Sequence, residues 1–227
     1  MANKIKWVTL DCYGTLIDWE SGIRAVVQNL LKEKGTKKHL PSNWMEHYIQ
    51  YEFLLERETY RPYREILALA LSKLFEKDFS ITLSPKESRT LADSLPDWSP
   101  FPDVKKVLTA LKDKVKFALL SNCDDDLLKK SVRQIGVDFH MLVTAQEVGS
   151  YKPVNNHWKK FMERSLAGAD EILHVAASRL HDVIPAKQLG ILSVWINRKG
   201  EKDDGYTHPD FVLKDLTKLP EVLSRLI

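Results

Sequence analysis

The stretch IKWVTLDCYGTLID, residues 5–18, decides the fold. Its first six residues form a short, mostly apolar run, which predicts a buried strand. Asp11 ends that run, and the Tyr-Gly-Thr at residues 13–15 is typical of a tight turn. We therefore expect residues 5–10 to form a strand that delivers Asp11 to a turn at its carboxyl end.

Four further apolar runs come much later in the chain. They cover residues 117–122, 141–145, 171–178 and 191–197. Helical patterns separate them, at residues 124–136, 155–166 and 181–190. Strands that alternate with helices of this length predict an α/β fold with a doubly wound parallel sheet, covered by helices on both faces.

The segment between the first strand and the rest has a different pattern. From about residue 21 to residue 95, apolar residues recur every three or four positions, which predicts four helices and no strand. The proline-rich segment 95–104 is typical of an extended return linker. We therefore predict an α/β core made of residues 1–17 and 97–227, with a helical cap, residues 18–96, inserted after the first strand.

Composition excludes several classes of protein. The 227 residues include 34 basic and 31 acidic side chains of interspersed sign, a net charge of +3 that does not favour nucleic-acid binding. No apolar stretch is long enough to cross a membrane, and the first residues lead into a strand without a signal-peptide pattern, so we expect a cytoplasmic protein with no membrane partner. Cys12 and Cys123 are too few for a disulfide framework, and we expect them to pack in the core.

Polar side chains follow the predicted strands. Because ligands of doubly wound sheets bind beyond the carboxyl ends of the strands, these side chains should converge on one site that holds a small anionic substrate. They are Asp11, Tyr13, Thr15, Ser121, Asn122, Lys152, Ser178 and Asp182.

Four motifs at this predicted site resemble the haloacid dehalogenase superfamily, and within it the type II L-2-haloacid dehalogenases. They are VTLDCYGTLID (8–18), LLSNCDDDLL (119–128), AQEVGSYKP (145–153) and HVAASRLHDVIPAKQLG (174–190). Their order and spacing along nearly the whole core carry the resemblance. It implies a Rossmann-like core with a cap, and hydrolysis of a carbon–halogen bond through an aspartyl ester.

The resemblance also assigns roles to the site residues. Asp11 corresponds to the nucleophile, because a carboxylate can attack carbon and leave an ester that water cleaves. Thr15 would fix the Asp11 rotamer, Lys152 would neutralise Asp11, and Asp182 would orient Lys152 or help to activate water. Tyr13, Ser121, Asn122 and Ser178 are the predicted substrate-binding residues.

Two positions separate dehalogenases from the phosphatases of this superfamily. The phosphatases carry a second Asp two residues after the nucleophile, where this chain has Tyr13, and a magnesium-binding Asp where it has Ala177. Since a departing halide needs no proton, the missing acid favours dehalogenation. We therefore predict no metal and no cofactor, with Mg²⁺ required only if the chain is a phosphatase.

The chain also departs from the dehalogenase pattern. Those enzymes carry an Arg early in the second cap helix, whereas NWMEHYIQYE, residues 43–52, contains none. The substitutes that we consider are Arg57, Arg61, Arg64, His47 and Tyr48. The sequence does not decide which of them takes the place of the missing Arg.

Simpler interpretations stay open for several residues. Ser121, Asn122 and Asp182 stand where helix caps occur, and we expect His174 and His181 to be structural or surface residues. The alternative functions are a magnesium-dependent phosphatase of small metabolites and a non-catalytic binding protein that retains the fold. By analogy with the family alone, the chain would form a homodimer.

Overall fold

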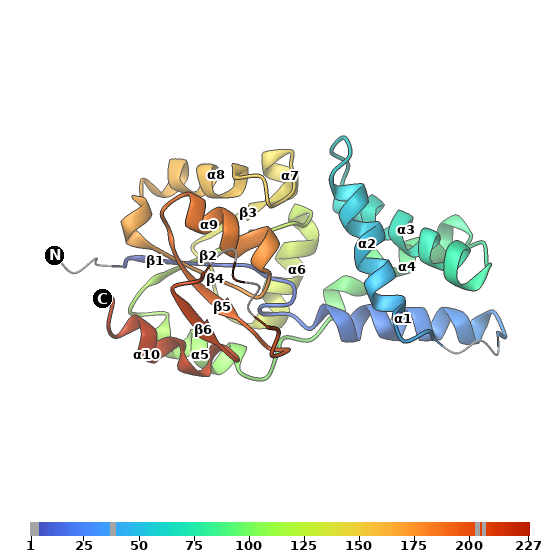
Figure 1. The fold of residues 1–227 in the computed structure, drawn as a ribbon, viewed down its shortest axis with the longest axis horizontal. Coiled ribbons are helices and arrows are strands. Elements are labelled where there is room, and N and C mark those ends of the chain that lie inside the picture. The colour runs from blue at the N-terminus through green and yellow to red at the C-terminus, as the bar shows by residue number, and fades with distance from the viewer. Residues whose placement is uncertain (1–4, 37–39, 203–204, 206–207) are drawn as a thin grey trace.

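The computed structural model describes residues 5–36, 40–202, 205 and 208–227. Within them a parallel sheet forms the centre of the core, in the order β3-β2-β1-β4-β5-β6 (Figure 1). The strands are β1 (Trp7–Leu10), β2 (Lys116–Ser121), β3 (Met141–Thr144), β4 (Ile172–Ala176), β5 (Leu192–Ile196) and β6 (Phe211–Leu213). The predicted doubly wound α/β fold is therefore confirmed, and β6 is a strand that the sequence analysis missed.

Helices cover both faces of this sheet, so its strands are apolar on both sides. Trp7 and Leu120 pack under α8 and α9, whereas Val8 and Leu119 belong to the larger cluster beneath α5, α6 and α10. Successive strand residues thus enter opposite layers, as the two-residue period of a strand requires. The helices are α5 (Val104–Leu111), α6 (Asp125–Ile135), α7 (Ala145–Val148), α8 (Asn156–Ser165), α9 (Ile184–Gln188) and α10 (Leu219–Leu223).

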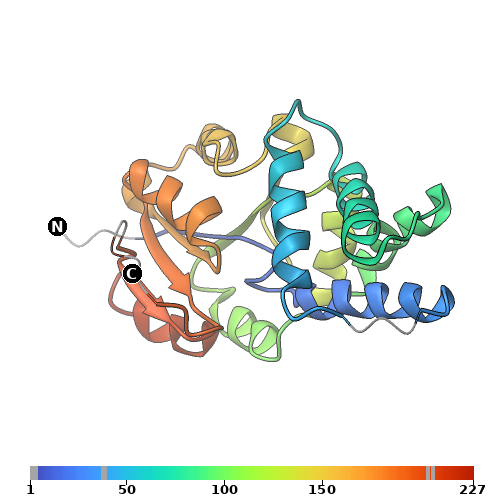
Figure 2. The ribbon, with the colours of Figure 1, turned by 45° about the vertical axis from the view of Figure 1, so that its right-hand side comes forward.

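The cap contains the four helices that the apolar periodicity predicts. They are α1 (Trp19–Glu33), α2 (Trp44–Glu56), α3 (Tyr63–Leu74), which continues as the π-helical turn Phe75–Phe79, and α4 (Pro85–Ser94). Ser84 and Glu87 form a capping box that fixes the start of α4. Figure 2 shows α2 between the sheet and the other cap helices, so α2 is the part of the cap that faces the core.

The two connections between core and cap run side by side. Ile17 pairs with Pro100 in an isolated antiparallel bridge, and the Asp18 amide donates to the Ser99 carbonyl at 2.9 Å. The proline-rich segment begins with a short 3-10 turn, Leu95–Asp97, before this extended part. The boundaries that we predict at 17/18 and 96/97 lie in these connections and stay a prediction.

Two local expectations differ from the structure. The predicted strand 171–178 ends at Ala176, and the predicted helix 181–190 begins earlier, as a π-helical turn, Arg179–Val183, that leads into α9. Ser178 caps this turn by accepting a hydrogen bond from the His181 amide at 3.1 Å. The turn places residues 179–183 at the end of β4 instead of within a regular helix.

Cys12 and Cys123 are buried free cysteines, as expected of residues packed in the core. No helix among the described residues is long and apolar enough to cross a membrane.

Candidate active site

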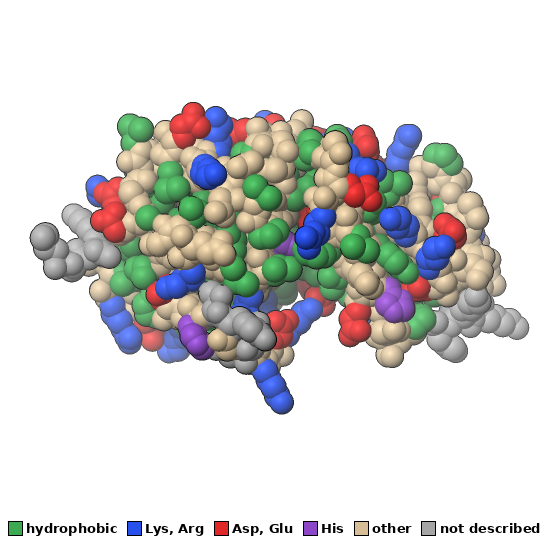
Figure 3. Space-filling model, turned by 45° about the horizontal axis from the view of Figure 1, so that its top comes forward, with side chains coloured by type: hydrophobic (Ala, Val, Ile, Leu, Met, Phe, Trp, Pro, Cys, Tyr) green, Lys and Arg blue, Asp and Glu red, His purple; other side chains and the backbone are tan. Residues whose placement is uncertain are grey.

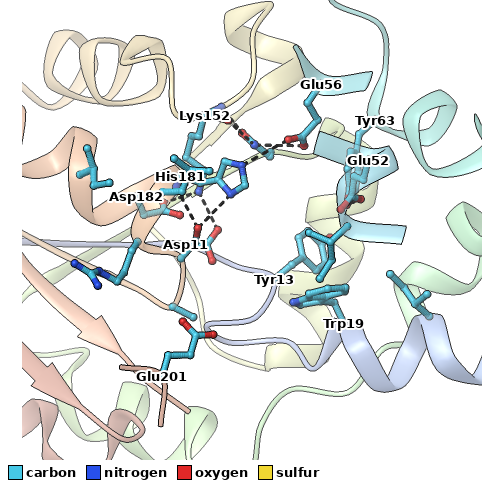
Figure 4. A pocket seen from close by; sticks show the side chains of 18 of the residues that line it. Asp11, Tyr13, Trp19, Glu52, Glu56, Tyr63, Lys152, His181, Asp182 and Glu201 are labelled. Atoms are coloured by element: carbon cyan, nitrogen blue, oxygen red, sulfur yellow. Dashed lines mark hydrogen bonds and ion pairs between the residues drawn. The ribbon is translucent and has the colours of Figure 1, made fainter. Parts of the chain in front are cut away.

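A pocket of about 550 Å³ opens between the carboxyl end of the sheet and the cap. Figure 3 shows the corresponding hollow in the surface between the two parts of the molecule. Core residues from the ends of β1, β2 and β4 line one wall, which we call the core wall, and residues of α1 and α2 line the opposite cap wall (Figure 4). The pocket therefore lies at the place where ligands of doubly wound sheets bind.

Asp11 lies on the core wall, one residue beyond the end of β1. Its amide donates to the Val175 carbonyl at 3.1 Å, so the pairing of β1 with β4 fixes its position. Its Oδ1 accepts from Lys152 Nζ at 2.9 Å and its Oδ2 accepts from the Thr15 hydroxyl at 2.6 Å. Thr15 in turn accepts from the Ala177 amide at 2.9 Å. These contacts hold the Asp11 carboxylate in one orientation.

Lys152 connects the two acidic residues of the core wall. Its ammonium donates to Asp11 at 2.9 Å, to Asp182 Oδ1 at 2.6 Å and to the Leu120 carbonyl at 2.9 Å. Burial by itself lowers the pKa of Lys152, but the charges of Asp11 and Asp182 outweigh burial and raise it. Lys152 is therefore a permanent cation in this site.

The two carboxyls that share Lys152 differ in acidity. Burial works against ionisation of Asp182, yet Lys152 and the His174 imidazole, 3.1 Å away, lower its pKa to about 2. Burial raises the pKa of Asp11, and the charge of Lys152 acts against that shift. Asp182 is thus the stronger acid of the pair and the less basic group.

The other predicted site residues lie in different surroundings. The Tyr13 ring lines the pocket, but its hydroxyl is hydrogen-bonded to Ser131 Oγ at 2.9 Å. Asn122 lines the pocket and holds the loop of Lys152, accepting from the Lys152 amide at 2.7 Å and donating to its carbonyl at 3.2 Å. Ser178 also lines the pocket.

Two predicted residues do not line the pocket, namely Thr15, which donates to Asp11, and Ser121. The Ser121 side chain is fully buried, and within the described part of the chain its hydroxyl has no hydrogen-bond partner. Its carbonyl forms a hydrogen bond with His157 Nε2 at 3.1 Å. The structure thus places Ser121, the last residue of β2, behind the pocket wall.

None of the five cap residues considered as substitutes for the dehalogenase Arg lines the pocket. Arg64 pairs with Asp124 and Asp126, Arg61 with Glu58, and His47 with Asp78. Arg57 stacks on Phe53, and Tyr48 donates to Glu52. These partners hold the five side chains away from Asp11.

The cap wall instead contributes two carboxyls that the sequence analysis missed, Glu52 and Glu56. Glu52 Oε1 accepts from the hydroxyls of Tyr63 at 2.9 Å and Tyr48 at 3.3 Å, and burial raises its pKa to about 7. Glu56 accepts from Asn122 Nδ2 at 3.4 Å, and burial raises its pKa well above the usual range. Tyr48, Glu52 and Glu56 follow one another at intervals of four residues. This spacing is the sequence signal that places them on one buried face of the helix.

His181 is a further pocket residue, in contrast to the structural or surface role expected from sequence. Its Nδ1 lies 3.2 Å from the Ser178 hydroxyl, and its buried Nε2 has no hydrogen-bond partner among the described residues. Nε2 lies 3.9 Å from Glu56 Oε2, and Figure 4 shows the ring between Glu56 and Asp11. Because burial lowers its pKa, the imidazole is neutral and has a nitrogen available to the pocket.

The donor set of the core wall does not suit a divalent cation. The Oδ1 atoms of Asp11 and Asp182 both accept from the Lys152 ammonium, which would repel Mg²⁺ from the space between them. Ala177 offers no side-chain oxygen, and the described residues contain no group of three or more His, Cys, Asp or Glu side chains arranged to hold a metal.

Comparison with known proteins identifies relatives of this chain. A family model described as haloacid dehalogenase-like hydrolase matches residues 5–190. The haloacid dehalogenase-like hydrolase domain-containing protein 3 of Danio rerio is 29% identical over 134 residues, which cover 56% of this chain and 54% of the relative. Glyceraldehyde 3-phosphate phosphatase of Methanocaldococcus jannaschii is 27% identical over 135 residues, covering 56% and 58%. The match thus spans little more than half the length of each curated relative.

Solved structures match over almost the whole chain. L-2-haloacid dehalogenase of Xanthobacter autotrophicus, with chloropropionic acid covalently bound, has a TM-score of 0.82 at 20% identity, covering 97% of this chain and 98% of that one. The HAD-hydrolase YfnB of Bacillus subtilis, bound to magnesium, has the same TM-score at 15% identity, covering 97% and 99%. At these identities the similarity shows a shared fold, the core with its helical cap.

Proposed function

Because the chain belongs to the haloacid dehalogenase-like hydrolases, we propose that it cleaves the carbon–halogen bond of a short (S)-2-haloacid through an ester with Asp11. The proposal treats the pocket between core and cap as the active site and a small anionic molecule as the substrate. It needs no metal or cofactor.

In the first step, an Asp11 oxygen attacks the carbon that bears the halogen. A carbon–oxygen bond forms, and the halide leaves with the electrons of the carbon–halogen bond. Lys152 and Thr15 support this step because they hold the carboxylate in one orientation at 2.9 and 2.6 Å. The halide is a weak base, so no group has to donate a proton to it.

The observation that carries the proposal is the environment of Tyr13. This residue stands where a phosphatase acid is expected, yet it has no carboxyl, and its hydroxyl is bonded to Ser131 and not to Asp11. Burial raises the pKa of Tyr13 well above its usual range, which makes it a poor proton donor. The site is thus better suited to a leaving group that departs without a proton.

In the second step, water attacks the carbonyl carbon of the Asp11 ester. We assign one proton of this water to Nε2 of His181, a pocket residue whose Nε2 has no hydrogen-bond partner in the described part of the chain. The ester bond then breaks, and the imidazolium gives its proton to the product oxygen. The other proton of the water is left on the Asp11 carboxyl and is released to solvent, which restores the carboxylate. Asp182 is a weaker base for this step because its Oδ1 is bonded to Lys152 and His174.

Halide release from 2-chloropropanoate and fluoroacetate, with and without Mg²⁺, tests the proposed reaction. We expect release without Mg²⁺, and a rate at least 10⁴-fold lower in Asp11→Asn, because this variant lacks the nucleophile. In a single turnover in ¹⁸O water, the label should enter Asp11 before it enters the product. Label that reaches the product without passing through Asp11 would exclude the ester.

A separate measurement tests the role of His181. In His181→Asn we expect a normal burst of halide followed by slow ester breakdown, so that mass spectrometry detects the Asp11 adduct. Ester breakdown at the wild-type rate in this variant would assign water activation to another group.

One observation favours a second candidate, a phosphatase of small metabolites. The matched region is 27% identical to a glyceraldehyde 3-phosphate phosphatase. Hydrolysis of a phosphate ester that EDTA abolishes, together with no halide release from any 2-haloacid, would support this candidate over the first.

A further inference from the structure

The cap wall carries two acidic side chains that have no lysine or arginine partner among the described residues. Glu52 and Glu56 lie one turn apart on α2 and both line the pocket. Their described hydrogen-bond donors are the hydroxyls of Tyr48 and Tyr63 and the amide of Asn122. Within the described chain, no Lys or Arg nitrogen lies within ion-pair distance of either carboxyl.

Lys152 does not supply this missing charge. Its ammonium already pairs with Asp11 and Asp182, at 2.9 and 2.6 Å. The other basic residues that line the pocket are Arg179 and Lys202, and no ion pair joins either of them to Glu52 or Glu56 in the described part of the chain. His181 Nε2, which lies 3.9 Å from Glu56 Oε2, is uncharged while it acts as a base.

Such an arrangement makes ionisation of these two side chains costly. The Glu56 side chain is only 8% exposed, so an ionised Glu56 would lose most of its hydration without gaining a cation. A positively charged group that enters the pocket would recover this cost, and a methyl group of the same size would not. The pocket volume of about 550 Å³ leaves room for such a group beyond the atoms that react at Asp11.

We propose that Glu52 and Glu56 select a substrate that carries an ammonium group at the end remote from the reacting carbon. The core wall would hold the electrophilic, acidic end of the substrate beside Asp11, and the cap wall would hold the ammonium. This inference rests on the proposed function for the position of the reacting carbon, but not for the position of the cation.

Matched pairs of substrates test the selection. One member of each pair is a 2-chloro acid of four to six carbons with an ammonium group at its far end. The other member has a methyl group in place of that ammonium. An example is 6-amino-2-chlorohexanoate with 2-chloroheptanoate. We expect kcat/KM of the wild type to favour the ammonium member of at least one pair more than tenfold. The ratio should fall to about one in the double variant Glu52→Gln/Glu56→Gln.

The matched control is Glu46→Gln, which changes an exposed residue of the same helix outside the pocket. It should keep the wild-type ratio. Because each ratio compares two substrates on one protein, a variant that is partly unfolded does not distort it. A wild-type ratio of one or less for every pair, or a ratio that survives in the double variant, would overturn the proposal.

A binding measurement separates this proposal from the proposed reaction. Titration calorimetry with 6-aminohexanoate and heptanoate needs no turnover. Tighter binding of 6-aminohexanoate to the wild type that is lost in the double variant supports the cation site, even if no 2-haloacid releases halide. Equal binding of the two ligands to the wild type contradicts it.

Discussion

The two walls of the pocket both bury carboxyls, but they stabilise them in different ways. On the core wall, Lys152 lies within 2.9 Å of Asp11 and 2.6 Å of Asp182, and the pKa of Asp182 falls to about 2. On the cap wall, Glu52 has only hydroxyl partners, and its pKa rises to about 7. Burial alone therefore does not define the state of an acidic residue. The charge of Lys152 acts against burial, and together with His174 it outweighs burial at Asp182, whereas at Asp11 burial prevails and raises the pKa.

The largest effect should follow from removing the cation of the core wall. Lys152→Met leaves Asp11 and Asp182 buried without a counter-charge, so the free energy of unfolding should fall by about 3–5 kcal/mol. Urea denaturation measures this loss. The half-exposed Lys160, which pairs with Glu163 on the surface, supplies the control, since Lys160→Met should cost less than about 0.5 kcal/mol. Similar losses in the two variants would mean that the core wall does not depend on its cation.

On the cap wall, neutralising Glu52 should stabilise the protein at high pH. Its pKa of about 7 in the folded state exceeds the ordinary value of 4.5, so stability is highest below pH 4.5 and is lost as the pH rises through 7. Glu52→Gln removes this loss, a gain of up to about 3 kcal/mol at pH 8 with little gain at pH 4. Urea denaturation at both pH values measures the difference. A gain that is equal at both would show that ionisation is not its cause.

Asp182 should show the opposite dependence on pH. Because its pKa of about 2 lies below the ordinary value of 3.8, its contribution to stability is complete above pH 3.8 and disappears as the pH falls to 2. The stability of the wild type should therefore drop by about 2 kcal/mol more over this interval than that of Asp182→Asn. Acid titration followed by circular dichroism tests this, and parallel curves would contradict it.

The smallest effect concerns Tyr13, which touches the pocket without belonging to either charged group. Tyr13→Phe removes the hydrogen bond to Ser131 and should lower the free energy of unfolding by about 1 kcal/mol. Turnover should change less than about threefold, because the hydroxyl is bonded to Ser131 and not to Asp11. A large loss of activity with unchanged stability would place this hydroxyl in the reaction.

The core wall was accessible to prediction because its residues follow strands. Asp11 follows an apolar run, Lys152 lies in a loop with a recognisable motif, and parallel strands bring their carboxyl ends together. Hydrogen bonds of Lys152 with both acids agree with that prediction. The short strand β6 was not predicted from sequence, because the partly exposed Phe211–Leu213 lacks a long apolar run.

The residues of the cap wall could not be predicted in the same way. Periodicity predicts α2 as a helix, but it cannot show which face of a separate helical unit turns toward the sheet. Arg57, Arg61 and Arg64 were plausible pocket residues by charge, and the packing of the cap directs all three elsewhere. The same packing brings Glu52 and Glu56 to the pocket instead.

His181 shows the limit of local reasoning most clearly. The lack of a second His or Cys at metal-ligand spacing favoured a structural or surface role for it, whereas the structure places it in the pocket, on the π-helical turn Arg179–Val183.

The amino-acid sequence by itself determined the α/β fold, the helical cap and the acidic and basic residues at the strand ends. These depend on the period of apolar residues and on motifs within short segments, which are local properties of the chain. Only the tertiary structure decided which side chains of the cap line the pocket and which of them are left without a lysine or arginine partner. Those features depend on contacts between residues far apart in the sequence, such as Glu56 and Asn122, and on the burial that such contacts create.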